Sequence, residues 1–182
     1  MSNSDHVRLM ASYNAWMNVK VFEAAMKLPD QELAANRKAF FGSILGTLNH
    51  LAVTDTLWLK RFAAHPAGHA ELEPIRRLPA PGSLNQILFA DIRSLSVHRN
   101  MLDDAITGWA ASVTDADLDH VLHYANTKGV VSDRSFFSLV MHFFNHQTHH
   151  RGQATTLLFQ AGIDVGVTDL LALIPNQTGT RQ

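Results

Sequence analysis

The sequence contains no cysteine among its 182 residues. This absence excludes disulfide bonds, zinc or iron–sulfur sites held by cysteine, and any nucleophilic thiol belonging to the protein itself. Thiol chemistry at this protein would therefore require a thiol supplied from outside.

Charge is also scarce. Charged residues make up 17% of the chain, and 15 basic against 16 acidic residues give a formal net charge of −1. No dense run of lysine and arginine is present to follow a phosphate backbone, so nucleic acid is not an expected partner.

Long hydrophobic runs are missing as well. The most apolar segment, residues 136–144, is interrupted by Ser138 and His142, and the first five residues have neither the basic start nor the apolar stretch of a signal peptide. We therefore expect no membrane partner and a cytoplasmic location.

Helical periodicity dominates what is present. Apolar residues recur every three or four positions over four long segments, which predicts helices over residues 5–28, 41–62, 83–111 and from 133 or 135 to 162. Ser83 is the expected N-cap of the third helix, and Gly162 the expected stop of the fourth. Repeated prolines and glycines in residues 65–82 predict a long loop with room for a short extended piece.

Two smaller elements complete the expected fold. Two short β-type segments flank Asn126 to Gly129 and predict a small hairpin, and residues 169–173 predict a short helix before a polar tail that we expect to fray. The sequence thus predicts one all-α domain over residues 1–182. Its architecture is a four-helix bundle with a β-hairpin between the third and fourth helices and a short C-terminal helix.

Histidine is the unusual component, with 11 residues, four of them between His142 and His150. At about 100° per residue, with His142 at zero, the apolar side chains of this helix centre near about 130°. His150 then lies near about 80° and His146 near about 40°, whereas His149 lies near about −20° with His142 toward the opposite face. His146 and His150 therefore lie at the core margin on successive turns, a geometry that offers two nitrogens to one metal ion, although such a pair can also be two boundary polar residues.

The spacing of this pair resembles the zinc-protease signature His-Glu-x-x-His, in which glutamate is the general base. Gln147 occupies the glutamate position here. An amide does not accept and return a proton near neutral pH, so the protease mechanism is excluded while a metal site is not.

A third ligand should come from another helix, because catalytic metal sites commonly use three protein ligands. His50 in the second helix and His98 in the third are the two candidates, and periodicity does not choose between them. The remaining histidines are expected to be solvated or in turns: His6, His65, His69, His120 and His123.

Asp55 lies near the middle of the apolar face of the second helix, where an unpaired carboxylate is costly. The simpler interpretation is a buried hydrogen-bond anchor, with Trp16 or Tyr13 as partner. The alternative is a carboxylate that orients a ligand histidine. The three tryptophans, at positions 16, 58 and 109, are expected in the core rather than in a cofactor stack.

Several segments together resemble the DinB family, within the wider DinB/YfiT-like group of metalloenzymes. The resemblance spans nearly the whole chain and rests on YNAWMN (13–18), SILGTLNHL (43–51) with Asp55 and Trp58, NHQTHHRGQ (145–153), and Gly162 followed by Asp169. It implies a four-helix bundle, a homodimer, and a metal bound by His50, His146 and His150. It thus selects the same pair as the helical angles and places His50 ahead of His98.

Three neutral imidazoles would leave a divalent metal, zinc first and nickel second, with an open coordination position. We favour an enzyme of the thiol-dependent S-transferase type, in which the metal activates an external low-molecular-weight thiol toward a small-molecule substrate. The alternatives are a metal-dependent hydrolase, for which no general base is assigned, and a non-catalytic metal-binding protein of the damage response. No catalytic residue other than the metal ligands is assigned.

Overall fold

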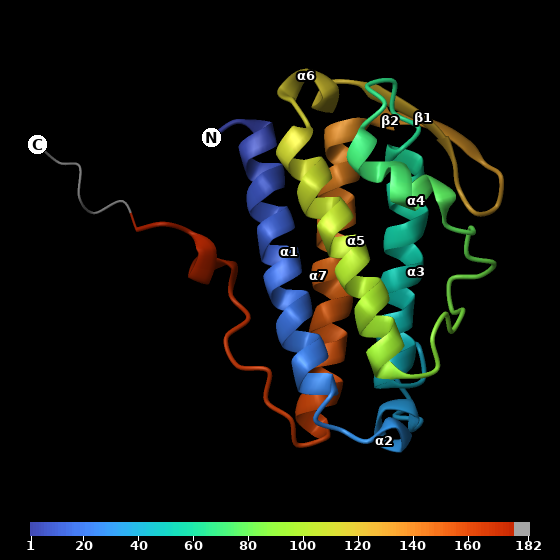
Figure 1. Ribbon diagram of the computed structural model, residues 1–182, viewed down its shortest axis with the longest axis vertical. Helices are drawn as coiled ribbons and strands as arrows, with labels where there is room; N and C mark the ends of the chain where they lie inside the picture. The colour runs from blue at the N-terminus through green and yellow to red at the C-terminus, as the bar shows by residue number, and fades with distance from the viewer. Residues whose placement is uncertain (177–182) are drawn as a thin grey trace, which may run out of the picture.

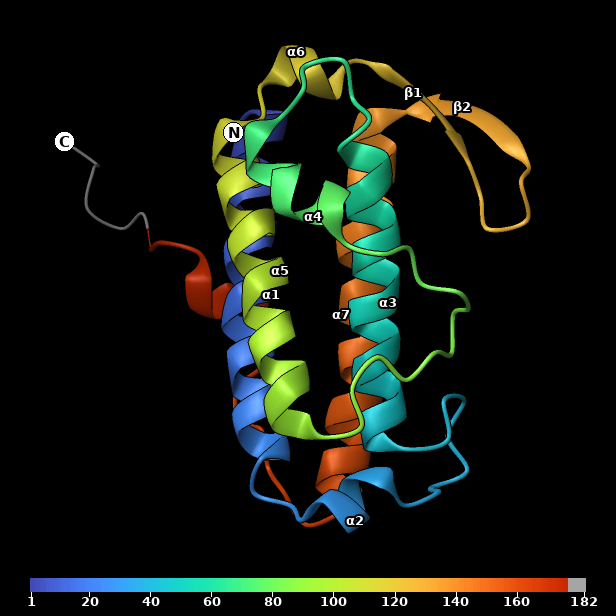
Figure 2. The same ribbon diagram turned by 45° about the vertical axis from the view of Figure 1, so that its right-hand side comes forward.

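The computed structural model describes residues 1–176, and its main body is the predicted helical bundle (Figure 1). The polar tail expected to fray lies largely outside the described residues. Four long helices form the bundle: α1 (Asn3–Ala25), α3 (Ile44–Phe62), α5 (Ile92–Ser112) and α7 (Phe136–Gln160). In both ribbon views α1 lies beside α5 and α7, and α3 lies beside α7 and α5, so the four helices enclose one core (Figure 2).

Short elements join the long helices: α2 (Asp30–Ala34), the 3₁₀ helix η1 (Ala70–Leu72), α4 (Glu73–Arg77), α6 (Asp115–Leu118) and a final 3₁₀ helix η2 (Leu170–Leu173). The predicted loop at residues 65–82 therefore contains η1 and α4 in place of an extended piece. Pro74 is compatible with α4 because it lies in the first turn, where its missing N–H has no intrahelical partner to lose.

The predicted hairpin is confirmed between α6 and α7. Strand β1 (Val121–Ala125) pairs antiparallel with β2 (Val131–Ser135). The Asn126 side-chain oxygen accepts from the backbone N–H groups of Lys128 and Val130, and Gly129 takes a φ of 77° that favours glycine.

Local capping explains where α7 begins and ends. The Ser135 hydroxyl accepts from the backbone N–H of Ser138, which confirms the second of the two predicted caps. At the other end, Gly162 has a φ of 84° and donates to the Phe159 carbonyl, while Ile163 donates to the Leu158 carbonyl. This paired C-terminal motif confirms Gly162 as the predicted stop.

The predicted start of the third helix is wrong. Helix α5 begins at Ile92 with Asp91 as its cap, not at Ser83. Asn49 of α3 accounts for the difference, because its side-chain oxygen accepts from the backbone N–H groups of Leu88 and Phe89 at 2.8 and 3.0 Å, and its amide donates to the Phe89 carbonyl at 3.0 Å. These backbone groups are held by α3 and are unavailable for an earlier turn of α5.

The core is built from the inner faces of the four long helices. Trp109 is fully buried, and Trp16 and Trp58 are half-buried and pack against the core, so all three contribute to it as predicted. The Trp58 ring also lies near Tyr124 and His142. Among the described helices, none is long and apolar enough to cross a membrane.

Candidate metal centre

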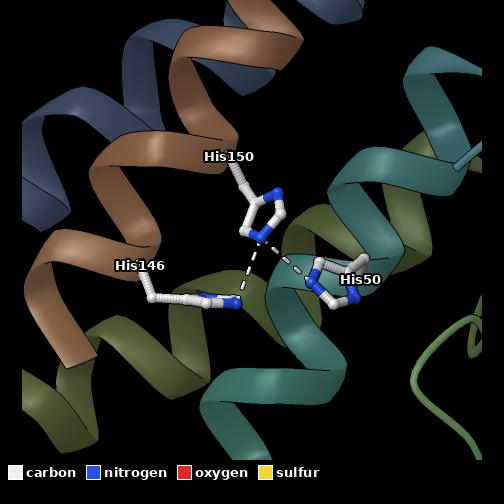
Figure 3. A group of neighbouring side chains, drawn as sticks. All are labelled: His50, His146 and His150. Carbon is white, nitrogen blue, oxygen red and sulfur yellow. Dashed lines mark hydrogen bonds between the residues drawn. The ribbon is translucent and has the colours of Figure 1, made fainter. Parts of the chain in front are cut away.

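The structure brings His50 of α3 together with His146 and His150 of α7 (Figure 3). The Nε2 atom of His150 lies 3.3 Å from Nε2 of His50 and 3.1 Å from Nε2 of His146. One ligand atom from each of the three residues lies within 4.8 Å of the others. The three predicted ligands therefore converge on one point, and all three belong to rigid helices.

Burial differs across the three rings. His50 is 4% exposed and His150 is 9% exposed, whereas His146 is half-buried. The group is thus closed toward the core and more open on the side of His146.

Hydrogen bonds at Nδ1 fix which nitrogen carries the proton in two of these rings. His50 Nδ1 lies 2.7 Å from the Leu84 carbonyl oxygen, and His150 Nδ1 lies 2.8 Å from Gln153 Oε1. Both oxygens can only accept, so in the neutral rings each Nδ1 carries the proton and each Nε2 presents a lone pair. The 3.3 Å between these Nε2 atoms therefore separates two lone pairs, an arrangement that a cation would stabilise.

Burial also keeps the rings neutral. Desolvation is the main cause that lowers the pKa of all three histidines, and for His146 the pKa falls to about 3, with the neighbouring His150 and His50 adding to the effect. Because metal ions bind the neutral imidazole, these shifts reduce competition from protons at neutral pH. The donor set and its protonation therefore fit a divalent metal ion.

Phe41 covers one side of the group. Its ring stacks on His50, with centroids 3.8 Å apart, and meets His150 edge-on at 5.5 Å. Gly46 permits this approach, since a Cβ at that position would collide with the Phe41 carbonyl oxygen. The glycine in the first turn of α3 thereby helps to seat an aromatic cover over His50.

The other two histidines of α7 lie outside the group, as the helical angles predict. His142 and His149 are both exposed. His142 contacts Trp58, and His149 lies 3.3 Å from the Gln153 amide nitrogen. His98, the alternative third ligand, lies on α5 with its ring 5.1 Å from that of Phe89, beside an apolar cavity.

Asp55 is a buried anchor, but its predicted partners are wrong. Its carboxylate accepts from Arg99 of α5 at 2.5 Å and from the Gln147 amide at 2.9 Å, not from Trp16 or Tyr13. All three of these side chains are at most 2% exposed. The glutamine at the general-base position is therefore a buried hydrogen-bond donor to Asp55.

The Asp55 contacts continue into a polar layer that joins α1, α5 and α7. Arg99 also lies 3.0 Å from Asp103, which accepts from Asn14 and Asn18, and Arg151 donates to Asn14. Arg99 was not singled out from the sequence. A carboxylate in the middle of an apolar helix face needs a cation as partner, and Arg99 is a charged residue on the buried face of α5, which could have indicated the pair.

His65 and His69 lie in the turn segment after α3, as expected, but they are not solvated. They are 5% and 7% exposed, and with Asp117 of α6 they form a second group whose candidate ligand atoms lie within 4.8 Å. Here, however, the backbone N–H of Ala67 donates to His65 Nδ1 at 3.1 Å. The neutral His65 ring must then carry its proton on Nε2, so it does not present a lone pair there.

Two cavities flank α7 on either side of the histidine group. One, of about 570 Å³, is lined by Trp58, Tyr124 and His142 toward the hairpin. The other, of about 510 Å³, is lined by Lys38, His149 and Gln153 toward α2. The group is therefore close to space that a small molecule could enter.

Fold and site together define an all-α bundle with a three-histidine group between two of its helices. The DinB family profile matches residues 1–180, so the chain belongs to the DinB family. It is similar to a Bacillus subtilis (strain 168) protein named "Protein DinB", with 24% identity over 180 residues covering 91% of this chain and 92% of that protein. No solved structure matches the chain.

Proposed function

We propose that His50, His146 and His150 hold a divalent metal ion, with zinc as the first candidate and nickel as the second. The observation that carries this proposal is the pair of inward-facing lone pairs on His50 and His150, fixed by the Leu84 carbonyl and Gln153. A bound metal would supply Lewis acidity that lowers the pKa of a thiol or water molecule at the open position.

We further propose that the protein is a thiol-dependent transferase acting on a small electrophilic substrate. Hydrolysis would need a residue that takes a proton from water, but an amide, Gln147, occupies the general-base position, and the Asp55 carboxylate accepts a hydrogen bond from that amide in the core. A thiol loses its proton far more readily than water does, so a thiol-dependent reaction needs no such base at this site. The lack of cysteine is consistent with a thiol that comes from solution.

The other residues of the site have supporting roles in this proposal. The Leu84 carbonyl and the Gln153 side chain hold two rings in the required tautomer and orientation. Phe41 excludes water from the His50 side, so the ligand is expected to enter beside the half-buried His146.

The first test is elemental analysis of tag-free protein beside a variant with His50, His146 and His150 all changed to Ala. We expect about one metal ion per chain in the wild type and none in the variant. Absence of metal in both proteins after supplementation with zinc, nickel, iron and manganese would overturn the metal assignment.

The second test is consumption of a thiol together with an electrophile by metal-loaded and metal-stripped protein. We expect metal-dependent conjugation that requires both compounds. If the protein binds a stoichiometric amount of metal but catalyses neither conjugation nor the hydrolysis of esters or amides, the non-catalytic alternative is favoured. A homodimer is also expected from the family, and light scattering during size-exclusion chromatography tests it.

A further inference from the structure

The cavity toward the hairpin combines aromatic, hydroxyl and cationic side chains. It is formed by Trp58 of α3, Tyr124 of β1, Arg134 of β2 and His142 of α7, with Ser135 and Ser138 at its edge. Aromatic rings thus form its walls, two serines supply hydroxyl groups, and Arg134 gives the lining a positive charge.

This cavity adjoins the histidine group along α7. His142 lies one helical turn before His146, and the centroids of the two rings are 6.0 Å apart. On its other side the His142 ring meets Trp58, with centroids 5.1 Å apart. A molecule whose reactive end lies at His146 can therefore extend past His142, one turn or about 5.4 Å along α7, to reach Trp58.

A second arginine, Arg61, lies against two of the aromatic rings that line the cavity. The Arg61 guanidinium lies 4.4 Å from the centroid of the Trp58 ring and 5.3 Å from that of Tyr124. Burial lowers the pKa of Arg61 from its usual value, but an arginine so placed stays protonated. The cation is thus held against the aromatic wall and is only partly hydrated.

Neither cation is neutralised by a carboxylate. Among residues 1–176, Arg61 and Arg134 form no ion pair, in contrast to Arg8, Arg37 and Arg99. Asp133, the neighbour of Arg134 on β2, is paired with His123 at 2.8 Å. The two arginines therefore leave their donors available to an anion from solution.

We infer that this cavity binds the non-reacting end of the ligand that the histidine group activates, and that this end is a carboxylate on an apolar or aromatic body. The body packs on Trp58 and Tyr124, and Arg134 and Arg61 hold the carboxylate. The inference rests on the proposed function, which it deepens by giving the charge of the thiol. Because an anionic end fixes the ligand at a point remote from sulfur, Arg134 is a specificity-determining residue and not a catalytic one.

The test uses cobalt-loaded, tag-free protein and three thiols of equal chain length: 6-mercaptohexanoate, 6-mercaptohexan-1-ol and 6-aminohexane-1-thiol. Binding of sulfur to cobalt is followed by its near-ultraviolet charge-transfer band. We expect the carboxylate to bind about tenfold more tightly than the alcohol, the factor that corresponds to one charge-assisted hydrogen bond, and the amine to bind most weakly.

Two matched variants locate the effect. Arg134→Gln should reduce the preference for the carboxylate to within about threefold while leaving the affinity for the alcohol unchanged. Lys38→Gln removes a cation from the opposite cavity and should leave the preference intact. A preference that survives Arg134→Gln, or that is lost in Lys38→Gln instead, would overturn the assignment to this cavity.

A second measurement separates this inference from the proposed function. Calorimetric titration with 4-phenylbutyrate and with 4-phenylbutan-1-ol examines the cavity with ligands that contain no thiol. If 4-phenylbutyrate binds in an Arg134-dependent manner but no thiol gives a band, the cavity assignment is supported and thiol use is wrong. If all three thiols give the band equally and 4-phenylbutyrate does not bind, thiol use is supported and the cavity assignment is wrong.

Discussion

Two groups of histidines in this bundle begin from the same sequence spacing and reach opposite electronic states. His146 and His150 are four residues apart on α7, and His65 and His69 are four residues apart in the segment between α3 and η1. Each pair is joined by a third residue, His50 or Asp117, with the candidate ligand atoms within 4.8 Å. Proximity alone therefore does not distinguish the two groups.

The partner on the far side of the ring does distinguish them. In the first group, the Leu84 carbonyl and Gln153 accept from Nδ1 of His50 and His150, which leaves lone pairs directed at a common point. In the second, the Ala67 N–H donates to Nδ1 of His65, which occupies the lone pair of that nitrogen and places the proton of the neutral ring on Nε2. The comparison teaches that a group of neighbouring histidines is prepared for a metal only when its outer hydrogen bonds set the tautomers.

The largest expected effect comes from removing one histidine of each group. His150→Ala should abolish stoichiometric metal binding, from about one ion per chain to none, because two ligands hold a divalent ion poorly. His69→Ala should retain the full metal content. Circular dichroism of both variants checks that the helical fold persists, and loss of metal in His69→Ala alone would reverse the comparison.

A smaller effect is expected from the outer hydrogen bond to His150. Gln153→Ala should weaken zinc binding by about 10–100-fold, since the ring loses the acceptor that fixes its tautomer. Gln153→Glu keeps an acceptor at that position and should bind zinc at least as well as the wild type. Competition with a colorimetric chelator measures both affinities, and equal weakening in the two variants would argue against the tautomer explanation.

The pH dependence of the metal-free protein should reflect the lowered pKa values. His50, His146 and His150 bind protons more weakly in the folded chain than in the unfolded chain, so unfolding takes up protons below pH about 6.5 and stability falls as the pH decreases toward about 3. His146→Gln should flatten this dependence by at most about 1.4 kcal/mol per pH unit. Urea unfolding between pH 7 and 5 measures the slope, and an unchanged slope in His146→Gln would contradict this explanation.

The smallest change is spectroscopic. In metal-free protein at pH about 7.5, nitrogen NMR should show His50 and His150 protonated on Nδ1 and His65 protonated on Nε2. Long-range proton–nitrogen correlations identify each tautomer without a mutation. A proton on Nδ1 of His65 would remove the difference between the two groups.

Sequence reasoning identifies the pair His146 and His150 on α7, because periodicity alone sets which residues share a face of one helix. The angle of about 40° between His146 and His150 follows from any regular helix. The choice of His50 over His98 needed the family resemblance, because it depends on which helices are neighbours and at what height. In the structure α3 adjoins α7 at His50, while His98 of α5 faces Phe89.

Interactions between distant segments account for the predictions that failed. Ser83 is a good cap by composition, yet Asn49 on α3 holds the backbone of residues 88–89 and delays the start of α5. Asp55 was identified as needing a partner, but the identity of that partner, Arg99, depends on helix packing. Likewise His65 follows a helix and resembles a solvated turn residue until η1 and α6 bury it.

The inward position of Gln147 also limits how this protein can evolve. Gln147 occupies the position where a zinc protease has its glutamate. A Gln147→Glu change would place a second carboxyl group beside Asp55. Arg99 already forms an ion pair with Asp55. One of the two acids would have to keep its proton, because both positions are buried in the core. A single substitution in the helix that carries both histidines therefore does not open a route to protease chemistry, and descendants that gained a hydrolytic base would have had to recruit it from another part of the fold.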